Sequence, residues 1–137
     1  MKVVSLLEPW AYLWATQQKK LETRSWATKY RGRMGLHASK GFVGYNSLLC
    51  FQEPFLSALL EVGIGAPAML PKGAIIATFD LVDVIPITPG FVTTLSPKEI
   101  AFGDYTPSRF AWVPKNMKLL PEPIPVKGQL GLWEYDL

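Results

Sequence analysis

The sequence predicts an α+β fold organised around a small, barrel-like sheet. The segments with alternating apolar residues are short, helical segments interrupt them, and the two kinds do not alternate regularly along the chain. Hydrophobic residues make up 49% of the 137 residues, and a chain of this size needs no disulfide or metal to hold its core. We therefore expect one domain that spans residues 1–137.

Residues 1–40 predict one helix among three strands. Val3–Leu7 is a short apolar strand, and it stops where Pro9 suits the first turn of a helix. Apolar residues then repeat at helical spacing, so we expect this helix to end near Gln18. Leu21–Trp26 and Arg33–Ser39 are the next two predicted strands, and a turn containing a glycine separates them.

The middle of the chain predicts helical segments followed by the clearest strand. Tyr45–Val62 is expected to be helical in two pieces, because Pro54 interrupts it. The glycine- and proline-containing run 63–67 is expected to be a loop. Gly73–Ile85 alternates apolar residues on one face, which is typical of a strand in a sheet.

The last part of the chain predicts one more helix and several short strands. Ser96 is suited to cap a helix, Pro97 to occupy its first position, and Glu99 to bond back to the cap. Short strands and an extended, proline-fixed connector then complete the sheet: the strands are Phe110–Val113, Asn116–Leu120 and Gly131–Tyr135, and the connector is Leu120–Pro125.

Composition excludes several classes of site. The single Cys50 excludes an internal disulfide framework and a multi-cysteine zinc site, and the single His37 argues against a histidine metal cluster. No apolar run reaches the ~18–20 residues of a membrane span, and the first residues lack the organisation of a signal peptide. We expect a cytoplasmic protein without a cofactor, a metal ion or a membrane partner.

Positive charge is concentrated at the start of the chain. Residues 1–40 carry eight Lys or Arg against two Glu, whereas residues 41–137 carry six basic and nine acidic residues. A basic segment in an otherwise mildly acidic chain indicates an anionic partner. The alternative is a solvated face that happens to be rich in lysine.

Lys19, Glu22 and Arg24 form the first group of residues with the means for chemistry. Here a helix is expected to end and a strand to begin. Alternation along that strand places Glu22 and Arg24 on one face, and Lys19 at the junction can turn toward the same face. A lysine beside a carboxylate can transfer protons, and a guanidinium can hold a phosphate or carboxylate in a fork. The alternative is a surface ion-pair cluster, which contributes little to stability.

Aromatic residues follow this group closely. Trp26 and Tyr30 suit stacking on a nucleobase above its phosphate, and ordinary core packing is the alternative. His37 lies in an apolar strand and is expected to be a buried, hydrogen-bonded group. Lys40, at the end of that strand, is the better candidate for contact with an anion. Cys50 lies in an apolar stretch and is expected to serve packing.

A second group lies in the predicted loop before the strand at Phe110. Asp104 and Arg109 are placed to pair across this loop and fix its shape. Alternatively, Arg109 faces a ligand, with Tyr105 or Trp112 stacking beside it. Phosphate-binding glycine loops, nucleophile elbows and dinucleotide fingerprints are absent from the sequence.

Short sequence blocks form an ordered set over nearly the whole chain. The first are Ser5-Leu6-Leu7-Glu8-Pro9-Trp10-Ala11, Lys19-x-x-Glu22-x-Arg24-Ser25-Trp26, Tyr30-Arg31-Gly32 and Leu36-His37-Ala38-Ser39-Lys40. The later ones are Glu99-x-x-Phe102-Gly103-Asp104-Tyr105, Arg109-Phe110-Ala111-Trp112, Pro123-Ile124-Pro125-Val126-Lys127-Gly128 and Gly131-Leu132-Trp133. Together they resemble the ASCH domain family, named for activating-signal-cointegrator homology, and above all its small, stand-alone bacterial and phage members.

The resemblance implies a PUA-like fold, a small β-barrel with flanking helices, and a cleft for RNA or nucleotides lined by the Lys-x-x-Glu-x-Arg segment. It also implies possible chemistry, since one branch of small relatives deacetylates N4-acetylcytidine and another cuts RNA. The deacetylating branch uses a lysine, a threonine and a glutamate. Lys19 matches the lysine, Glu22 takes the place of the threonine, and Thr23 is one residue off and expected to face the other way. Glu99 is the candidate for the glutamate.

Three hypotheses of function follow. The first is a module that binds RNA or a nucleotide through Arg24, Trp26, Tyr30 and Lys40, together with Asp104, Tyr105 and Arg109. The alternative is a hydrolase, either an N4-acetylcytidine-type amidohydrolase or a ribonuclease, in which Glu22 accepts a proton and Lys19 stabilises developing negative charge. A protein-interaction domain with a vestigial cleft is the third, and the retained charged trio argues against it.

Overall fold

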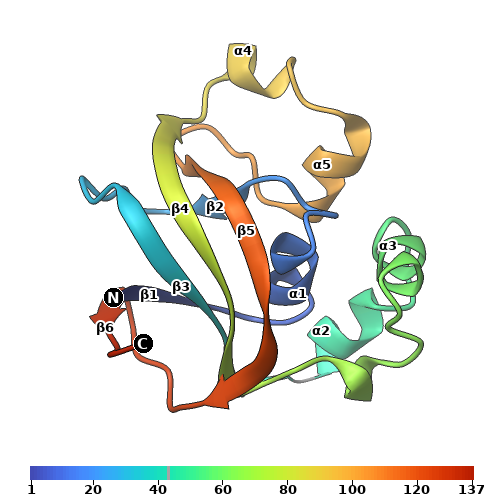
Figure 1. Ribbon diagram of the computed structural model, residues 1–137. Helices are drawn as coiled ribbons and strands as arrows, with labels where there is room; N and C mark the ends of the chain where they lie inside the picture. The colour runs from blue at the N-terminus through green and yellow to red at the C-terminus, as the bar shows by residue number, and fades with distance from the viewer. Residues whose placement is uncertain (43) are drawn as a thin grey trace.

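A computed structural model describes residues 1–42 and 44–137 (Figure 1). The strands are β1 (Lys2–Leu6), β2 (Glu22–Arg24), β3 (Gly32–Ala38), β4 (Ala74–Pro86), β5 (Phe110–Pro125) and β6 (Leu132–Glu134). The helices are α1 (Trp10–Ala15), α2 (Gly44–Leu49), α3 (Phe55–Glu61), α4 (Pro89–Val92) and α5 (Pro97–Phe102), with a 3-10 turn, η1, at Pro67–Met69. The fold is α+β and PUA-like, as the sequence predicts.

The six strands form one sheet in the order β2-β5-β4-β3-β1-β6. β1 and β3 pair in parallel, and the other neighbours are antiparallel. The pairing of β4 with β5 shifts register three times, and such irregularities bend a strand and increase its twist. The long β4 and β5 therefore curl together, so that the sheet forms a half-barrel (Figure 1).

Helix α1 fills the inside of this half-barrel. It contacts β1, β3, β4 and β5, and its Trp14 packs on Phe79 of β4 with a centroid distance of 4.8 Å. A second apolar cluster joins α3 to α1 and α5, with Phe55 edge-on to both Trp10 and Phe102. These two clusters pack the end of β1 and the end of α5 around α1, next to the site described below.

Several local predictions are confirmed, and others give an element the wrong length. The Ser96 hydroxyl caps α5 by accepting the Glu99 amide at 3.1 Å, but the Glu99 carboxylate does not return to the cap. It accepts the Lys20 amide at 2.7 Å instead, because its helix packs against the chain that follows α1. The predicted helix after Pro9 stops at Ala15, where a left-handed Gln17 turns the chain.

The C-terminal strands differ most from the prediction. The two strands and the connector predicted between Phe110 and Pro125 form one continuous strand, because the extended backbone imposed by its prolines continues the pairing with β4. Residues 63–67 are largely loop, as expected, and η1 and α4 were not predicted. The hydroxyl of Thr88 caps α4 at the amide of Phe91. Within the described residues, no helix has the length and apolar character needed to cross a membrane.

Candidate functional site

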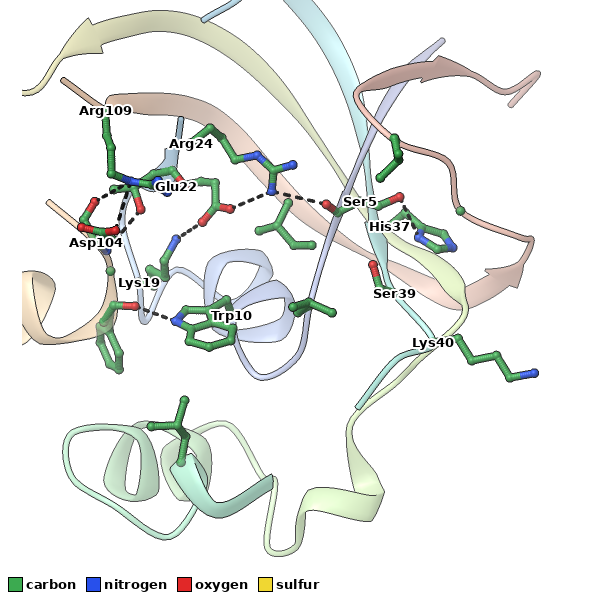
Figure 2. A pocket seen from close by; sticks show the side chains of 18 of the residues that line it. Ser5, Trp10, Lys19, Glu22, Arg24, His37, Ser39, Lys40, Asp104 and Arg109 are labelled. Carbon is green, nitrogen blue, oxygen red and sulfur yellow. Dashed lines mark hydrogen bonds and ion pairs between the residues drawn. The ribbon is translucent and has the colours of Figure 1, made fainter. Parts of the chain in front are cut away.

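A cleft of about 980 Å³ opens where β1, β2 and β3 meet the loop after α5 and the segment 127–131. Among the residues proposed from the sequence, six line it: Lys19, Glu22, Arg24, Lys40, Asp104 and Arg109. Figure 2 shows their side chains around the opening. Arg24 lies between the charged group, which consists of Lys19, Glu22, Asp104 and Arg109, and the pair Ser5 and His37. A cleft of this size is in the range that holds small ligands.

Lys19 and Glu22 form a buried ion pair at the wall of the cleft. The Lys19 side chain is fully buried, and its Nζ donates to Glu22 Oε1 and to the carbonyl of Leu21, both at 2.5 Å. The chain reversal at Gln17 turns Lys19 inward, and its ammonium lies 5.6 Å from the centroid of the Trp14 ring. The alternative of a solvated surface cluster is therefore wrong for this pair.

Arg24 extends from the same carboxylate into the cleft. Its Nη1 lies 3.4 Å from Glu22 Oε2 and 3.5 Å from the main-chain oxygen of Ser5. Glu22 thus bridges two cations, and the three side chains together carry one net positive charge. Arg24 is the most exposed of the three, so its remaining N–H groups are the ones that a ligand can reach.

Asp104 and Arg109 pair across the loop after α5, and this alternative from the sequence is confirmed. Arg109 Nε lies 3.5 Å from Asp104 Oδ2, and its Nη2 donates to the carbonyl of Thr23 at 3.3 Å. Hydrogen bonds from the amide and hydroxyl of Thr106 lower the pKa of the Asp104 carboxyl. The loop is thereby tied to β2, and Arg109 also faces the cleft.

Trp26 and Tyr30 do not line the cleft. Trp26 packs edge-on against Trp112 with a centroid distance of 4.9 Å, and the Arg24 guanidinium lies 5.6 Å from its ring centroid. The hydroxyl of Tyr30 donates to the carbonyl of Arg33. Stacking by Trp112 is wrong, since its ring is fully buried, whereas stacking by the partly exposed Trp26 and Tyr30 stays a prediction.

Tyr105 and Glu99 also lie outside the cleft. The Tyr105 hydroxyl donates to Glu99 Oε2 at 2.8 Å, and burial beside this carboxylate raises the pKa of Tyr105. Glu99 is buried as well, and its two oxygens hold the hydroxyl of Tyr105 and the amide of Lys20. Both residues therefore support the segment that carries Lys19.

Sequence reasoning missed one half of the cleft. Ser5, Ser39 and the segment around Gly128 line it, together with apolar side chains such as Trp10, whose Nε1 donates to the carbonyl of Phe102 at 2.7 Å. His37 is buried and hydrogen-bonded, as the sequence predicts, and it also borders the cleft. Spacing along the chain could not indicate these contacts, since they depend on strand pairing.

The side chains at the cleft that could ligate a metal ion are Glu22, Asp104 and His37. No cluster of three or more His, Cys, Asp or Glu side chains occurs in the described part of the chain. The two carboxylates at the cleft, Glu22 and Asp104, are each engaged by basic side chains.

The curled six-stranded sheet with its flanking helices is a PUA-like α+β fold. The chain belongs to the ASCH domain family, whose model matches residues 4–121. It is 27% identical over 138 residues to Activating signal cointegrator 1 of Mus musculus and of Homo sapiens, covering 97% of this chain and 22% of each relative. The chain therefore spans about a fifth of the length of these curated relatives.

Solved structures show the same fold. The crystal structure of ASCH from Zymomonas mobilis matches with a TM-score of 0.52 and 13% identity, covering 90% of this chain and 72% of that one. A serine-to-alanine mutant of the Zymomonas mobilis protein matches with a TM-score of 0.51 and 13% identity, covering 91% and 73% of the two chains. At this identity the likeness concerns the fold alone.

Proposed function

We propose that this ASCH domain binds RNA or a nucleotide in the cleft. The observation that carries the proposal is the charge of the lining: five basic side chains, Lys19, Arg24, Lys40, Arg109 and Lys127, against the carboxylates of Glu22 and Asp104. An excess of positive charge around one opening attracts anions. The phosphates of a nucleic acid are the anions that suit it best.

The arrangement of the cations supports phosphate binding. Arg24 and Arg109 are held in place by Glu22 and Asp104, so their free N–H groups are directed before a ligand arrives. Lys40 and Lys127 are exposed at the other end of the cleft and add longer-range attraction. Between the two ends, apolar side chains such as Trp10 and Phe55 offer a surface on which a base or ribose can lie.

The direct test is RNA binding by fluorescence anisotropy with a labelled single-stranded oligonucleotide at several salt concentrations. We expect binding that weakens as salt rises, since each phosphate contact releases counterions. The absence of binding at low salt, or an affinity that does not change with salt, would contradict the proposal.

Hydrolysis of a modified nucleoside or of RNA is the second candidate. The observation in its favour is the buried Lys19–Glu22 pair at the cleft wall, where a carboxylate can accept a proton and an ammonium can offset negative charge. The triad expected from deacetylating relatives is incomplete in the cleft, because Glu22 stands in place of the threonine and Glu99 lies outside. Thr23 does border the cleft, where its hydroxyl accepts the Asp104 amide.

Turnover by the wild-type protein decides between the two candidates. Purified protein is incubated with N4-acetylcytidine and, separately, with short RNAs, and the products are separated by chromatography. Binding of RNA without any product supports the binding module for those substrates. A product that disappears in Glu22→Gln, in protein shown to be folded, supports the hydrolase. The single-domain organisation and the cytoplasmic location expected from the sequence stay predictions.

A further inference from the structure

Ser5 and His37 face each other at the end of the cleft away from the charged group (Figure 2). The parallel pairing of β1 with β3 sets Ser5 opposite His37, and Ser5 Oγ lies 3.1 Å from His37 Nδ1. The other ring nitrogen, Nε2, lies 2.8 Å from the carbonyl oxygen of Val126. Trp133 Nε1 donates to Ser5 Oγ at 3.2 Å. The two side chains thus belong to one hydrogen-bonded chain.

The Val126 carbonyl, the Trp133 indole and a neutral His37 ring together fix the direction of these hydrogen bonds. A carbonyl can only accept, so the Val126 oxygen requires the proton on His37 Nε2. Burial lowers the pKa of His37, which keeps the ring neutral and leaves Nδ1 as an acceptor. Ser5 therefore gives its hydroxyl hydrogen to Nδ1, while one of its lone pairs accepts from Trp133.

Among the described residues, nothing occupies the last hydrogen-bonding position on Ser5 Oγ, which is a lone pair. The backbone at Gly128 confines it, because a Cβ at that position would lie 2.6 Å from His37 Cε1 and 2.9 Å from Ser5 Oγ. Trp133 packs edge-on to the His37 ring at 5.5 Å. The remaining direction is the cleft, where Arg24 already reaches the Ser5 main chain at 3.5 Å.

We infer that this end of the cleft is a base-reading subsite, in which Ser5 accepts a hydrogen bond from the exocyclic amino group of a nucleobase and His37 positions the hydroxyl. The inference rests on the proposed RNA binding and names the class of base: adenine, cytosine or guanine, in preference to uracil.

Discrimination against uracil follows from the fixed direction of the Ser5 hydroxyl. Where cytosine carries an amino group, uracil carries a carbonyl oxygen, whose lone pairs would meet the lone pair of Ser5. Ser5 cannot turn its hydrogen toward that oxygen without leaving His37 Nδ1 unpaired in a buried position. A site that is built to accept a donor rejects an analogue that lacks one.

The test compares three labelled ten-residue RNAs, made of cytidine, of uridine and of N4,N4-dimethylcytidine. Wild-type protein is expected to bind the cytidine RNA roughly three- to tenfold more tightly than either of the others, the scale of one hydrogen bond. Dimethylation removes the N–H donors of the amino group but adds bulk, whereas uridine replaces the amino group by an oxygen without added bulk. The preference for cytidine must therefore appear against both RNAs.

Variants then assign the preference to the two residues. Ser5→Ala is expected to bring all three affinities to within about twofold, a residual difference too small for a full hydrogen bond. His37→Phe frees the Ser5 hydroxyl to donate and is expected to abolish or reverse the preference for cytidine. Ser25→Ala, which removes an exposed hydroxyl outside the cleft, is the control and is expected to keep the preference.

Each outcome bears on a different claim. If wild-type protein binds cytidine and uridine RNA equally, the subsite is overturned and RNA binding stands. If the preference persists in folded Ser5→Ala, another group reads the base and the inference is wrong. If no RNA binds at low salt, the proposed function fails and the subsite with it. Should Ser5→Ala not fold, the three RNAs on wild-type protein still decide, since they need no variant.

Discussion

Lys19 Nζ and Glu22 Oε1 lie 2.5 Å apart with both side chains almost fully buried. Arg24, which also contacts Glu22, extends from this pair toward the open part of the cleft. A buried pair of this kind is costly to form and more costly to break, because the partner left behind keeps its charge away from water. The pair therefore has a structural role whatever else the cleft does.

The first prediction concerns this pair. Glu22→Gln should lower the free energy of unfolding by about 3 kcal/mol, because it leaves the Lys19 ammonium buried without its carboxylate. Urea unfolding followed by circular dichroism measures the change. The double variant Lys19→Met with Glu22→Leu should lose less unfolding free energy than the sum of the losses in Lys19→Met and in Glu22→Leu. Glu61→Gln, at an exposed position of α3, is the control, and an equally small effect at Glu22 would contradict the buried pair.

The second prediction concerns Arg24. Arg24→Lys should weaken RNA binding by roughly 1–3 kcal/mol, because an ammonium cannot hold a phosphate in the bidentate fork of a guanidinium. The melting temperature should hardly change, since Arg24 is partly exposed. Anisotropy titration and a thermal melt measure the two effects. Arg31→Lys, outside the cleft, is the control. A variant that loses stability but keeps its affinity would show that Arg24 serves the fold alone.

The third prediction separates the cleft from general basicity. The double change Lys40→Ala with Lys127→Ala removes two cations from the cleft and should reduce the slope of log affinity against log salt, roughly by one for each phosphate that the variant no longer binds. Lys115→Ala with Lys118→Ala removes the same charge from exposed positions of β5, away from the cleft. Equal slopes for the two double variants would indicate non-specific attraction by the whole protein.

The fourth prediction concerns the pH dependence of stability. Glu8 is fully buried, its Oε1 accepts the Tyr12 amide at 2.8 Å, and its Oε2 has no hydrogen-bond partner among the described residues. Burial raises the pKa of this carboxyl from 4.5 to about 8. The folded state therefore keeps a proton that the unfolded state loses above pH 4.5.

Stability from this group should thus be greatest below pH 4.5, fall as the pH rises toward about 8, and level off above that. Glu8→Gln, which is neutral at every pH, should remove this part of the dependence and make the variant the more stable protein at pH 8. Unfolding free energies of both proteins between pH 5 and pH 9 measure the difference. Parallel curves for the two proteins would show that Glu8 is ionised in the folded state.

The sequence contains enough local information for most of the fold. Alternation predicts β4, the Ser96 cap predicts the start of α5, and the spacing of Lys19, Glu22 and Arg24 places all three at one site. The sequence predicts the lengths of the strands and helices poorly. The strand β5 continues through residues that look like breaks, because pairing along the 13-residue β4 outweighs the local cost of proline and of a left-handed Asn116.

The candidate site is predictable only where its residues are close in sequence. Trp26 lies next to the cations in the chain, yet its ring packs edge-on against Trp112, which is 86 residues away in the sequence. Ser5 and His37 are 32 residues apart, and only the parallel pairing of β1 with β3 brings them together. Neither relationship has a signal in local spacing or propensity.

The place of β2 in the sheet gives the two halves of the cleft different resistance to local opening. β2 has three residues, is the last strand at one edge and pairs with β5 alone, whereas β1 and β3 lie inside the sheet. Amide hydrogens of β2 should therefore exchange with solvent faster than those of β3. Each opening of this edge displaces Glu22 and Arg24 and leaves Ser5 and His37 in place. An anion bound at Arg24 should therefore slow hydrogen exchange more in β2 than in β3. A substitution that weakens the pairing of β5 with β2 at Phe110–Trp112 should weaken anion binding, although these residues do not contact the ligand.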